Sequence, residues 1–280
     1  MTISEMHILF KLSLDKVGNS SLPYFEPEAI DLILNYAIKA VYKQKISGNN
    51  ALRQGAEETN KRRVDLQTMI VGYSTETFVT NSDNKPYGKF VEVPSNMFYL
   101  LDEEVCIFNK SCQKEVLSGN IEEGIMYKVV GTSVTYNSVT YSNGKTFIGI
   151  SGVTTYTVSS AKVYEALRVN VLPIRNDQYN TLTLDPFNRP GEDRVLKLDY
   201  GIISSKLYYE LIGNKTIDIL KYYLRYYKTP ATVKFPATAV DCDLPAIIHE
   251  EIVDFAVNWT LESIESPRFQ SQIANLQRNE

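Results

Sequence analysis

Histidine and cysteine, on which many catalytic and metal sites depend, are scarce in this sequence. The 280 residues include two histidines, His7 and His249, and three cysteines, Cys106, Cys112 and Cys242. The histidines have no metal-type spacing to another ligand, and the cysteines form no CxxC pair and are odd in number. The sequence therefore indicates neither a zinc site nor a disulfide framework, and it fits a reducing compartment such as a cytoplasm.

Long apolar runs, a strong net charge and phosphate-binding loops are missing as well. Charged residues interrupt the apolar residues of positions 1–17, so this stretch is neither a secretory signal nor a spanning helix. The 29 basic and 33 acidic residues give a formal net charge of −4, which provides no global attraction to nucleic acid or membranes but leaves room for a local basic face. Residues 144–152 contain neither a GxGxxG nor a P-loop pattern. We expect a soluble protein without a cofactor, a bound metal or a membrane contact.

Catalysis has weak support from the remaining residues. His249 beside Glu250 and Glu251 suggests acid–base chemistry, but a solvated position in the first turn of a helix explains this triplet better. A nucleophilic Cys242 would need a histidine partner, which only tertiary proximity could supply. We therefore expect that the protein is not an enzyme.

The clearest helix signal covers residues 243–264. Asp243 is expected to cap the N-terminal amides of this helix, and Pro245 suits its first turn. Apolar residues then recur at helical spacing, namely Ile248, Ile252, Phe255, Ala256 and Trp259. We expect this face, including Trp259, to be buried.

Three more helices are predicted near the N-terminus. The first covers about residues 2–17, where a strand alternation also fits, and the second begins at residues 26–28 and ends at Ser47. The third, from about residue 53 to residue 71, is only thinly apolar. The second helix has one apolar face, formed by Ile30, Ile33, Leu34, Ala37, Ile38, Val41 and Tyr42.

From Tyr73 onward the sequence reads as strands. Residues 77–80 and 89–93 flank a turn and predict a hairpin, and Asn143-Gly144 predicts a second hairpin inside a small all-β module at about 120–164. Further strands are predicted at 97–101, 105–108, 166–174, 194–199, 207–212 and 217–228, with a short helix at 177–182. The pairing of 194–199 with 207–212 is expected to be hairpin-like.

Helices come first, strands follow and a helix comes last, and this segregation favours an α+β fold over a doubly wound sheet. Short connections and single apolar faces predict that the C-terminal helix packs with the N-terminal helices as a bundle. The β region is then a large antiparallel insertion. The expected domains are residues 1–72 (N-terminal part of the bundle), 73–236 (β-rich insertion), 237–265 (C-terminal bundle helix) and 266–280 (polar tail).

A run of tyrosines and cations at residues 221–228 is one candidate contact site. Its composition resembles a platform for single-stranded nucleic acid, but a sheet strand with long side chains at its rim explains the alternation better. The tyrosines of this run are Tyr222, Tyr223, Tyr226 and Tyr227.

A second candidate is the triplet Lys61, Arg62 and Arg63 in the third helix. A solvated helix face is the ordinary explanation of such a triplet. In a ring-shaped assembly, the same face could line a channel that carries DNA.

Two stretches resemble a virion protein that is widespread in crAss-like phages of gut Bacteroidota. They are residues 173–190 (PIRNDQYNTLTLDPFNRP) with 194–199 (RVLKLD), and residues 243–257 (DLPAIIHEEIVDFAV). Residues 127–150 also resemble a β module of many phage structural proteins, and the order of elements resembles the head-to-tail adaptor, or connector-ring, proteins of tailed phages. The resemblance covers most of residues 165–265 and, more loosely, the first 70, and it includes no catalytic signature.

This resemblance implies a structural subunit of the virion, in its portal–tail region, made in the host bacterial cytoplasm. About twelve copies would form a ring around a channel for genome passage, stacked on the portal or on a neighbouring tail ring, with non-specific contact to DNA. The helices would form an adaptor-like bundle, and the four tyrosines would contact neighbouring subunits. The tail at 266–280 would dock on the portal or next ring through Phe269, Ile273 and Leu276.

Two other classes of function stay open at this stage. The tyrosine-rich β region could form a tail-associated binding module that holds a host glycan or another tail protein. A tail-associated hydrolase is the third hypothesis, with His249, Glu250 and Cys242 as the residues to nominate.

Overall fold

The chain forms two compact units. The computed structural model describes residues 1–17, 25–47, 60–79, 85–111, 113–158, 160–203, 205–236 and 238–263. One unit, the helical unit, combines Met1–Ile70 with Tyr227–Glu280, and the other, the sheet unit, is Val71–Tyr226. The sheet unit is thus inserted between the two segments of the helical unit. The limits fall at 70/71 and 226/227, against 72/73 and 236/237 in the sequence-based division.

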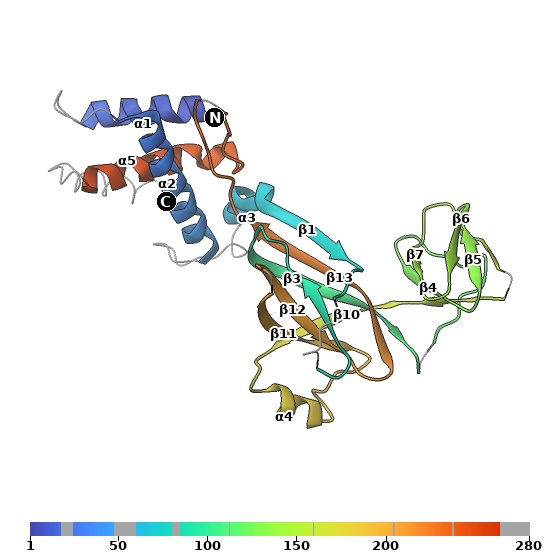
Figure 1. Ribbon diagram of the computed structural model, residues 1–280. Helices are drawn as coiled ribbons and strands as arrows, with labels where there is room; N and C mark the ends of the chain where they lie inside the picture. The colour runs from blue at the N-terminus through green and yellow to red at the C-terminus, as the bar shows by residue number, and fades with distance from the viewer. Residues whose placement is uncertain are drawn as a thin grey trace. The chain divides into compact units, whose positions relative to one another are not determined.

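Helices from both ends of the chain build the helical unit (Figure 1). Its helical elements are α1 (Ile3–Val17), α2 (Pro27–Ser47), α3 (Asn60–Leu66), η1 (Gln67–Met69), η2 (Ala246–Ile248) and α5 (His249–Ser263). Both α1 and α2 pack against α5. The helix prediction for the first stretch is confirmed, and α2 begins with Pro27 and Glu28 and buries the predicted apolar face.

The third predicted helix is shorter at its C-terminal end than expected. α3 ends at Leu66, and a 3-10 turn leads directly into a strand that begins at Ile70. The predicted positions 53–59 lie outside the described residues. The thin apolar pattern of this segment explains the difference, because too few apolar residues recur at helical spacing to extend the helix to residue 71.

The buried face of α5 differs from the predicted one. Phe255 is half-buried and Trp259 is 38% exposed, so the expectation that Trp259 is buried is wrong. The residues of α5 that are buried are His249, Ile252, Val253, Ala256, Val257, Asn258, Thr260 and Leu261. Two apolar stripes overlap on this helix and share Ile252 and Ala256, and the helix buries the aliphatic stripe rather than the aromatic one.

Two expectations about the start of this helix are also wrong. Asp243 does not cap it, since its carboxylate accepts from the Ala231 backbone N–H at 3.2 Å and pairs with Lys228 at 2.7 Å. His249 is buried rather than solvated, and its Nε2 donates to the Leu244 carbonyl at 2.9 Å. The histidine therefore holds the turn before α5, a role that depends on a backbone partner and leaves no mark in the sequence.

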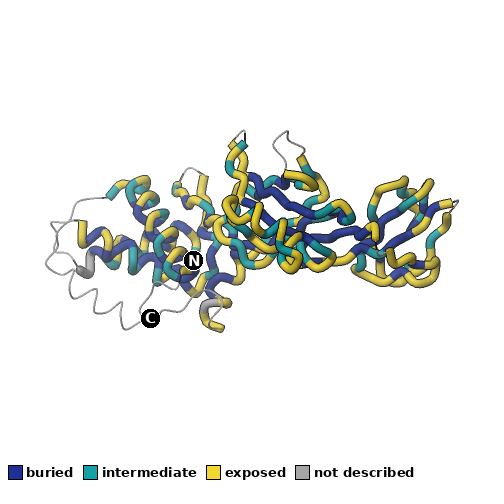
Figure 2. Tube along the Cα trace, turned by 90° about the horizontal axis from the view of Figure 1, so that it is seen from below, coloured by how far each residue is buried: buried dark blue, intermediate teal, exposed yellow. Residues whose placement is uncertain are grey.

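A seven-stranded sheet forms the body of the sheet unit, in the order β1-β13-β3-β10-β11-β12-β2. The strands are β1 (Ile70–Thr75), β2 (Gly88–Glu92), β3 (Met97–Asn109), β10 (Leu167–Ile174), β11 (Arg194–Ile203), β12 (Lys206–Ile212) and β13 (Ile217–Lys228). β3 is one strand where the sequence suggested two. Its C-terminal half and much of β11, β12 and β13 are buried. Figure 2 shows buried stretches of the chain in dark blue.

The prediction of an antiparallel β region is wrong at one pairing. β10 pairs with β11 in parallel, with Val171 opposite Val195. β10 with β3, β11 with β12 and β12 with β2 are antiparallel, and the pairing of β11 with β12 confirms the expected hairpin. The parallel pair is possible because the connection from β10 to β11 contains a helix, α4 (Tyr179–Leu184), and is long enough for the chain to return in the same direction.

The small β module consists of two three-stranded sheets, β7-β4-β9 and β6-β5-β8. Its strands are β4 (Met126–Val130), β5 (Ser133–Tyr136), β6 (Val139–Ser142), β7 (Thr146–Ile148), β8 (Tyr156–Val158) and β9 (Lys162–Glu165). The hairpin predicted at Asn143-Gly144 is wrong, because β6 and β7 belong to different sheets. The tight hairpin joins β5 to β6 through Asn137 and Ser138, whose φ angles are 45° and 63°.

The hairpin predicted around residues 81–86 is also incomplete. Of residues 77–79, Val79 makes an isolated bridge to Phe90, while β2 has β12 as its ladder partner. Residues 80–84 lie outside the described part of the chain. The pattern at 77–80 was misread because β-branched and aromatic residues also suit a single packed bridge.

Candidate assembly surfaces

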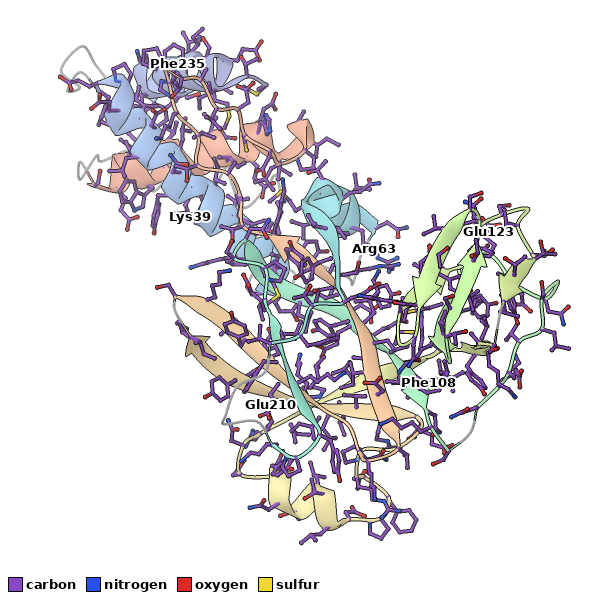
Figure 3. All side chains as sticks on the ribbon, turned by 45° about the vertical axis from the view of Figure 1, so that its right-hand side comes forward. Lys39, Arg63, Phe108, Glu123, Glu210 and Phe235 are labelled. Atoms are coloured by element: carbon purple, nitrogen blue, oxygen red, sulfur yellow. The ribbon has the colours of Figure 1, made fainter. Side chains whose placement is uncertain are left out.

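The predicted basic triplet lies on α3. Lys61 and Arg63 are exposed, and Arg63 is labelled on this helix in Figure 3. Arg62 belongs to the same helix. Asp65 and Leu66 of the same helix are 1% and 0% exposed. The helix therefore carries exposed cations near its start and buried residues at its end.

A buried ion cluster fixes α3 to its neighbours in the helical unit. The Lys45 ammonium of α2 lies 3.0 Å from the Asp65 carboxylate of α3 and 2.7 Å from the Glu251 carboxylate of α5. The side chains of Lys45 and Asp65 are each 1% exposed. Such a pair favours one packing of α2 against α3, because burial of either charge without its partner would lower the free energy of unfolding. Sequence reasoning missed it, since the three residues are far apart in the chain.

The tyrosine run forms β13, so its interpretation as a sheet strand is confirmed. Tyr222, Tyr226 and Tyr227 are buried, and Tyr223 keeps part of its surface in solvent. The Tyr222 hydroxyl donates to Glu103 at 2.8 Å, and the Tyr226 hydroxyl donates to Asn96 at 2.8 Å. Within the chain, most of this run thus serves internal packing, and Tyr223 is the one of the four with surface to offer a neighbour.

Charged side chains near this strand are engaged with one another. The Glu103 carboxylate accepts a hydrogen bond from Tyr222 and forms an ion pair with Lys197. The Lys197 ammonium lies 2.6 and 2.8 Å from the two carboxylate oxygens. Burial, followed by the nearby Glu103 charge, raises the pKa of Tyr222. Next to Glu103 is an open cavity of about 350 Å³, where Arg168 pairs with Glu104 at 3.3 Å and lies 4.5 Å above the Tyr223 ring. These contacts join β3, β10, β11 and β13 in one network of charged and tyrosine side chains.

The thiols have properties of packed side chains. Burial raises the pKa of Cys106 to about 12 and that of Cys242 to about 11, so both stay protonated at neutral pH. Across the ranges that the structure describes, no group of three or more His, Cys, Asp or Glu side chains is arranged to hold a metal ion. In the same ranges, no helix is both long and apolar enough to cross a membrane.

An exposed apolar strip on the helical unit was not predicted. Leu32 and Tyr36 lie one turn apart on α2 and are 73% and 49% exposed, and the ring of Tyr36 packs against Trp259 of α5. We call Leu32, Tyr36 and Trp259 the aromatic strip. Tyrosine and tryptophan are the residues most enriched among energetically dominant contacts of protein interfaces. Exposed apolar positions at i and i+4 beside the buried stripe were the signal available in the sequence.

The predicted docking residues of the tail, Phe269, Ile273 and Leu276, lie outside the described residues. The candidate contact surfaces that the structure does show are the exposed cations of α3 and the aromatic strip.

Known proteins match part of this chain. Residues 130–268 match the family described as phage tail ring protein 3/4. Over 110 residues the chain is 29% identical to Ring protein 3 of Bacteroides phage crAss001, a match that covers 35% of this chain and 45% of the relative. The chain thus matches less than half of the length of that relative. The resemblance seen in the sequence is confirmed: over about half of its length the chain is similar to tail ring proteins of crAss-like phages.

Proposed function

We propose that this chain is the subunit of a head-to-tail connector or tail ring, which stacks on the portal or on a neighbouring ring around a channel for the genome. About twelve copies would close the ring, as in the cyclic assemblies that repeat one heterologous contact. The helical unit would form the adaptor-like bundle of this subunit. Its task is structural, and no step of catalysis is part of the proposal.

The observation that carries the proposal is the aromatic strip. Leu32, Tyr36 and Trp259 expose large apolar side chains together on the surface shared by α2 and α5. Water contact with such a group is unfavourable, so a clustered apolar strip is typical of a surface that a partner covers. We assign the strip to the contact with the portal or with the next ring.

The cations of α3 support a channel-facing position for this helix. Lys61 and Arg63 are exposed on a helix that the buried pair of Lys45 and Asp65 anchors. Exposed cations on an anchored helix suit a weak contact with passing phosphates, because each contact is electrostatic and independent of sequence. The replacement of Lys61 and Arg63 by Gln should slow DNA ejection from particles at low salt and have little effect at high salt, and equal rates at both salt concentrations would contradict the DNA contact.

The environments of Cys242, His249 and Glu250 support a role without catalysis. The Cys242 thiol is protonated, and His249 is buried with its Nε2 bonded to a carbonyl. Glu250 is exposed on the first turn of α5, where a carboxylate favours the helix dipole. Glu250→Gln, at the exposed position of the three, should leave particle assembly and any hydrolysis by the particle unchanged, and loss of a cell-wall hydrolysis activity would contradict a purely structural role.

The alternative, a glycan- or protein-binding module built on the tyrosine-rich β region, has less support. Binding by stacking needs exposed rings, and Tyr87 and Tyr99 are 57% and 52% exposed, whereas Tyr127, Tyr136, Tyr222 and Tyr226 are each at most 3% exposed. The rings of these four buried tyrosines form parts of the cores of the small β module and the main sheet.

Particle composition tests the leading proposal. Mass spectrometry of purified virions should detect the chain at a fixed ratio to the portal protein, and its absence from particles would overturn the proposal.

Leu32→Asp should reduce incorporation into particles, while Val139→Asp, at a β6 position that is 51% exposed, should not. Deletion of the residues after 266 should leave the fold intact and weaken docking, and unchanged assembly would contradict a docking role for the tail.

A further inference from the structure

The connection between β10 and β11 presents two large apolar side chains to solvent. Leu184, the last residue of α4, and Phe187, in the turn that follows, are each 84% exposed. Scattered exposed apolar residues are ordinary, but two at almost full exposure within four positions are not. α4 projects from the sheet in Figure 1. We call Leu184 and Phe187 the apolar knob.

The chain holds this knob in one conformation. Asp185 accepts hydrogen bonds from the Phe187 backbone N–H at 2.9 Å and from the Asn188 amide at 2.6 Å, and its own carbonyl accepts from the Arg189 backbone N–H at 3.0 Å. At the other end of α4, Tyr179 packs against the core cluster that includes Leu196. A preorganised apolar element loses little conformational entropy when it binds, which is a property of interface anchors.

A second exposed apolar pair lies at the tip of the β11–β12 hairpin. Ile202 and Leu207 are directly opposite each other in the ladder, so their side chains lie on the same face of the sheet. They are 75% and 38% exposed. We call Ile202 and Leu207 the apolar tip.

The knob and the tip occupy the two ends of β11. The turn that carries Phe187 returns to the start of this strand, where Gly191 bridges Arg194 and the Asn214 side chain donates to the Pro190 carbonyl at 3.1 Å. The tip lies at the end of the same strand. Strand geometry places the two ends roughly 25–30 Å apart, so one neighbouring side chain cannot cover both.

We propose that the apolar knob of one copy packs against the apolar tip of the next copy in the ring. This inference rests on the proposed function, and it names the contact that closes the ring. A heterologous interface needs two different and complementary surfaces on each subunit, and here the two surfaces lie at the two ends of β11. Closure of the ring covers knob and tip on every copy at once, whereas a different protein would have to supply a separate surface for each.

Paired cysteines test this contact in the assembled particle. The full-length chain with Phe187→Cys and Ile202→Cys, in a Cys112→Ser background, is supplied from a plasmid during infection and incorporated into particles. Cys106 and Cys242 are buried, so the introduced thiols are the accessible ones of the described cysteines. After mild oxidation, a non-reducing gel of purified particles reports covalent multimers. The two single-cysteine chains, treated identically, are the matched controls.

We expect a ladder of covalent multimers from the double variant, at least tenfold more abundant than from either single variant. If the chain is in the particles and the double variant cross-links no more than the single variants, the knob–tip contact is wrong and the ring proposal stands. If the unsubstituted chain is missing from particles, the proposed function fails, and the contact fails with it.

A second measurement does not depend on cysteine chemistry. Leu184→Asp with Phe187→Asp should lower incorporation of the chain at least fivefold, while Val139→Asp, a change at an exposed apolar position elsewhere, should leave it unchanged. Circular dichroism of the purified chains verifies that both variants are folded. Incorporation equal to that of the unsubstituted chain would overturn the contact.

Discussion

Trp259 of α5 and Tyr36 of α2 face each other with ring centroids 4.8 Å apart and an angle of 34° between their planes. Both rings also contact solvent, being 38% and 49% exposed. Aromatic pairs of this kind add about 0.5–1.5 kcal/mol beyond the area that they bury. The pair therefore forms a contact between α2 and α5 at the surface, and part of both rings stays exposed as apolar area that a partner could cover.

The half-exposed state of Trp259 predicts a modest effect on folding. Trp259→Ala should lower the free energy of unfolding by about 1–2 kcal/mol, which is less than the ~3–5 kcal/mol of a fully buried aromatic residue. Urea denaturation of the purified chain measures this difference. Leu261→Ala, at a fully buried position on the same helix, should cost about 2–5 kcal/mol and is the control. A larger loss for Trp259→Ala than for Leu261→Ala would contradict the surface assignment.

The buried ion cluster predicts that the effect of removing Lys45 on the free energy of unfolding depends on whether Asp65 is present. Lys45→Met should destabilise the chain by about 3–5 kcal/mol, because it leaves the Asp65 carboxylate buried with its main partner removed. Lys45→Met combined with Asp65→Leu should cost clearly less than Lys45→Met alone. The comparison of unfolding midpoints of the three chains tests the coupling, and additive losses would show that the two groups do not interact.

Asp218 predicts a loss of stability in acid. Burial acts to raise the pKa of this carboxyl, but hydrogen bonds from Lys128 and Lys89 outweigh burial, and the net shift is downward. A lowered folded-state pKa contributes stability that is present above the unfolded value, about 3.9, and is lost as the pH falls through the folded value. Asp218→Asn should therefore lower stability at pH 7 by about 1–3 kcal/mol and flatten the decline below pH 4.

Glu92→Gln is the control for Asp218. The Glu92 carboxylate and the Lys206 ammonium form an ion pair at 2.8 Å with side chains 42% and 55% exposed, so solvent screens this pair and its loss should change stability little. Thermal unfolding measured from pH 3 to pH 8 distinguishes the two variants. An unchanged pH profile for Asp218→Asn would contradict the assignment.

The β5–β6 turn predicts a stabilising change. Ser138 has a φ of 63°, a left-handed conformation that glycine adopts at lower cost than serine. Ser138→Gly produces the Asn-Gly pair that such tight hairpins favour, and we expect a gain of about 0.5–1 kcal/mol in the free energy of unfolding. Gly144→Ala, at a φ of 81°, should be destabilising and is the reverse control. A loss of stability for Ser138→Gly in urea denaturation would count against this turn geometry.

Periodic patterns carried most of the fold prediction. The apolar face and Pro27 were enough to predict α2, and the alternation of side chains was enough to predict β13. Both elements therefore follow from local sequence. The α+β class followed from the order of elements. In each case one chain segment determines the outcome by its own spacing.

Contacts between distant segments account for what was missed. The parallel pairing of β10 with β11 depends on where the crossover helix α4 packs, and the roles of His249 and Asp243 depend on Leu244, Ala231 and Lys228. The aromatic strip was missed for the opposite reason, since Trp259 was taken as part of the buried stripe. Two apolar stripes on that helix fit helical spacing equally well, and packing against the other helices determines which of them is buried.

A cryo-EM map of the portal and tail in purified virions would show the ring assembly itself. We expect a closed ring of copies of this chain next to the portal or another tail ring, with the aromatic strip covered by that neighbour and the α4 knob of each copy on the β11–β12 tip of the next. A tail map in which no ring fits this chain, or in which the chain stands alone on the outer surface, would contradict it.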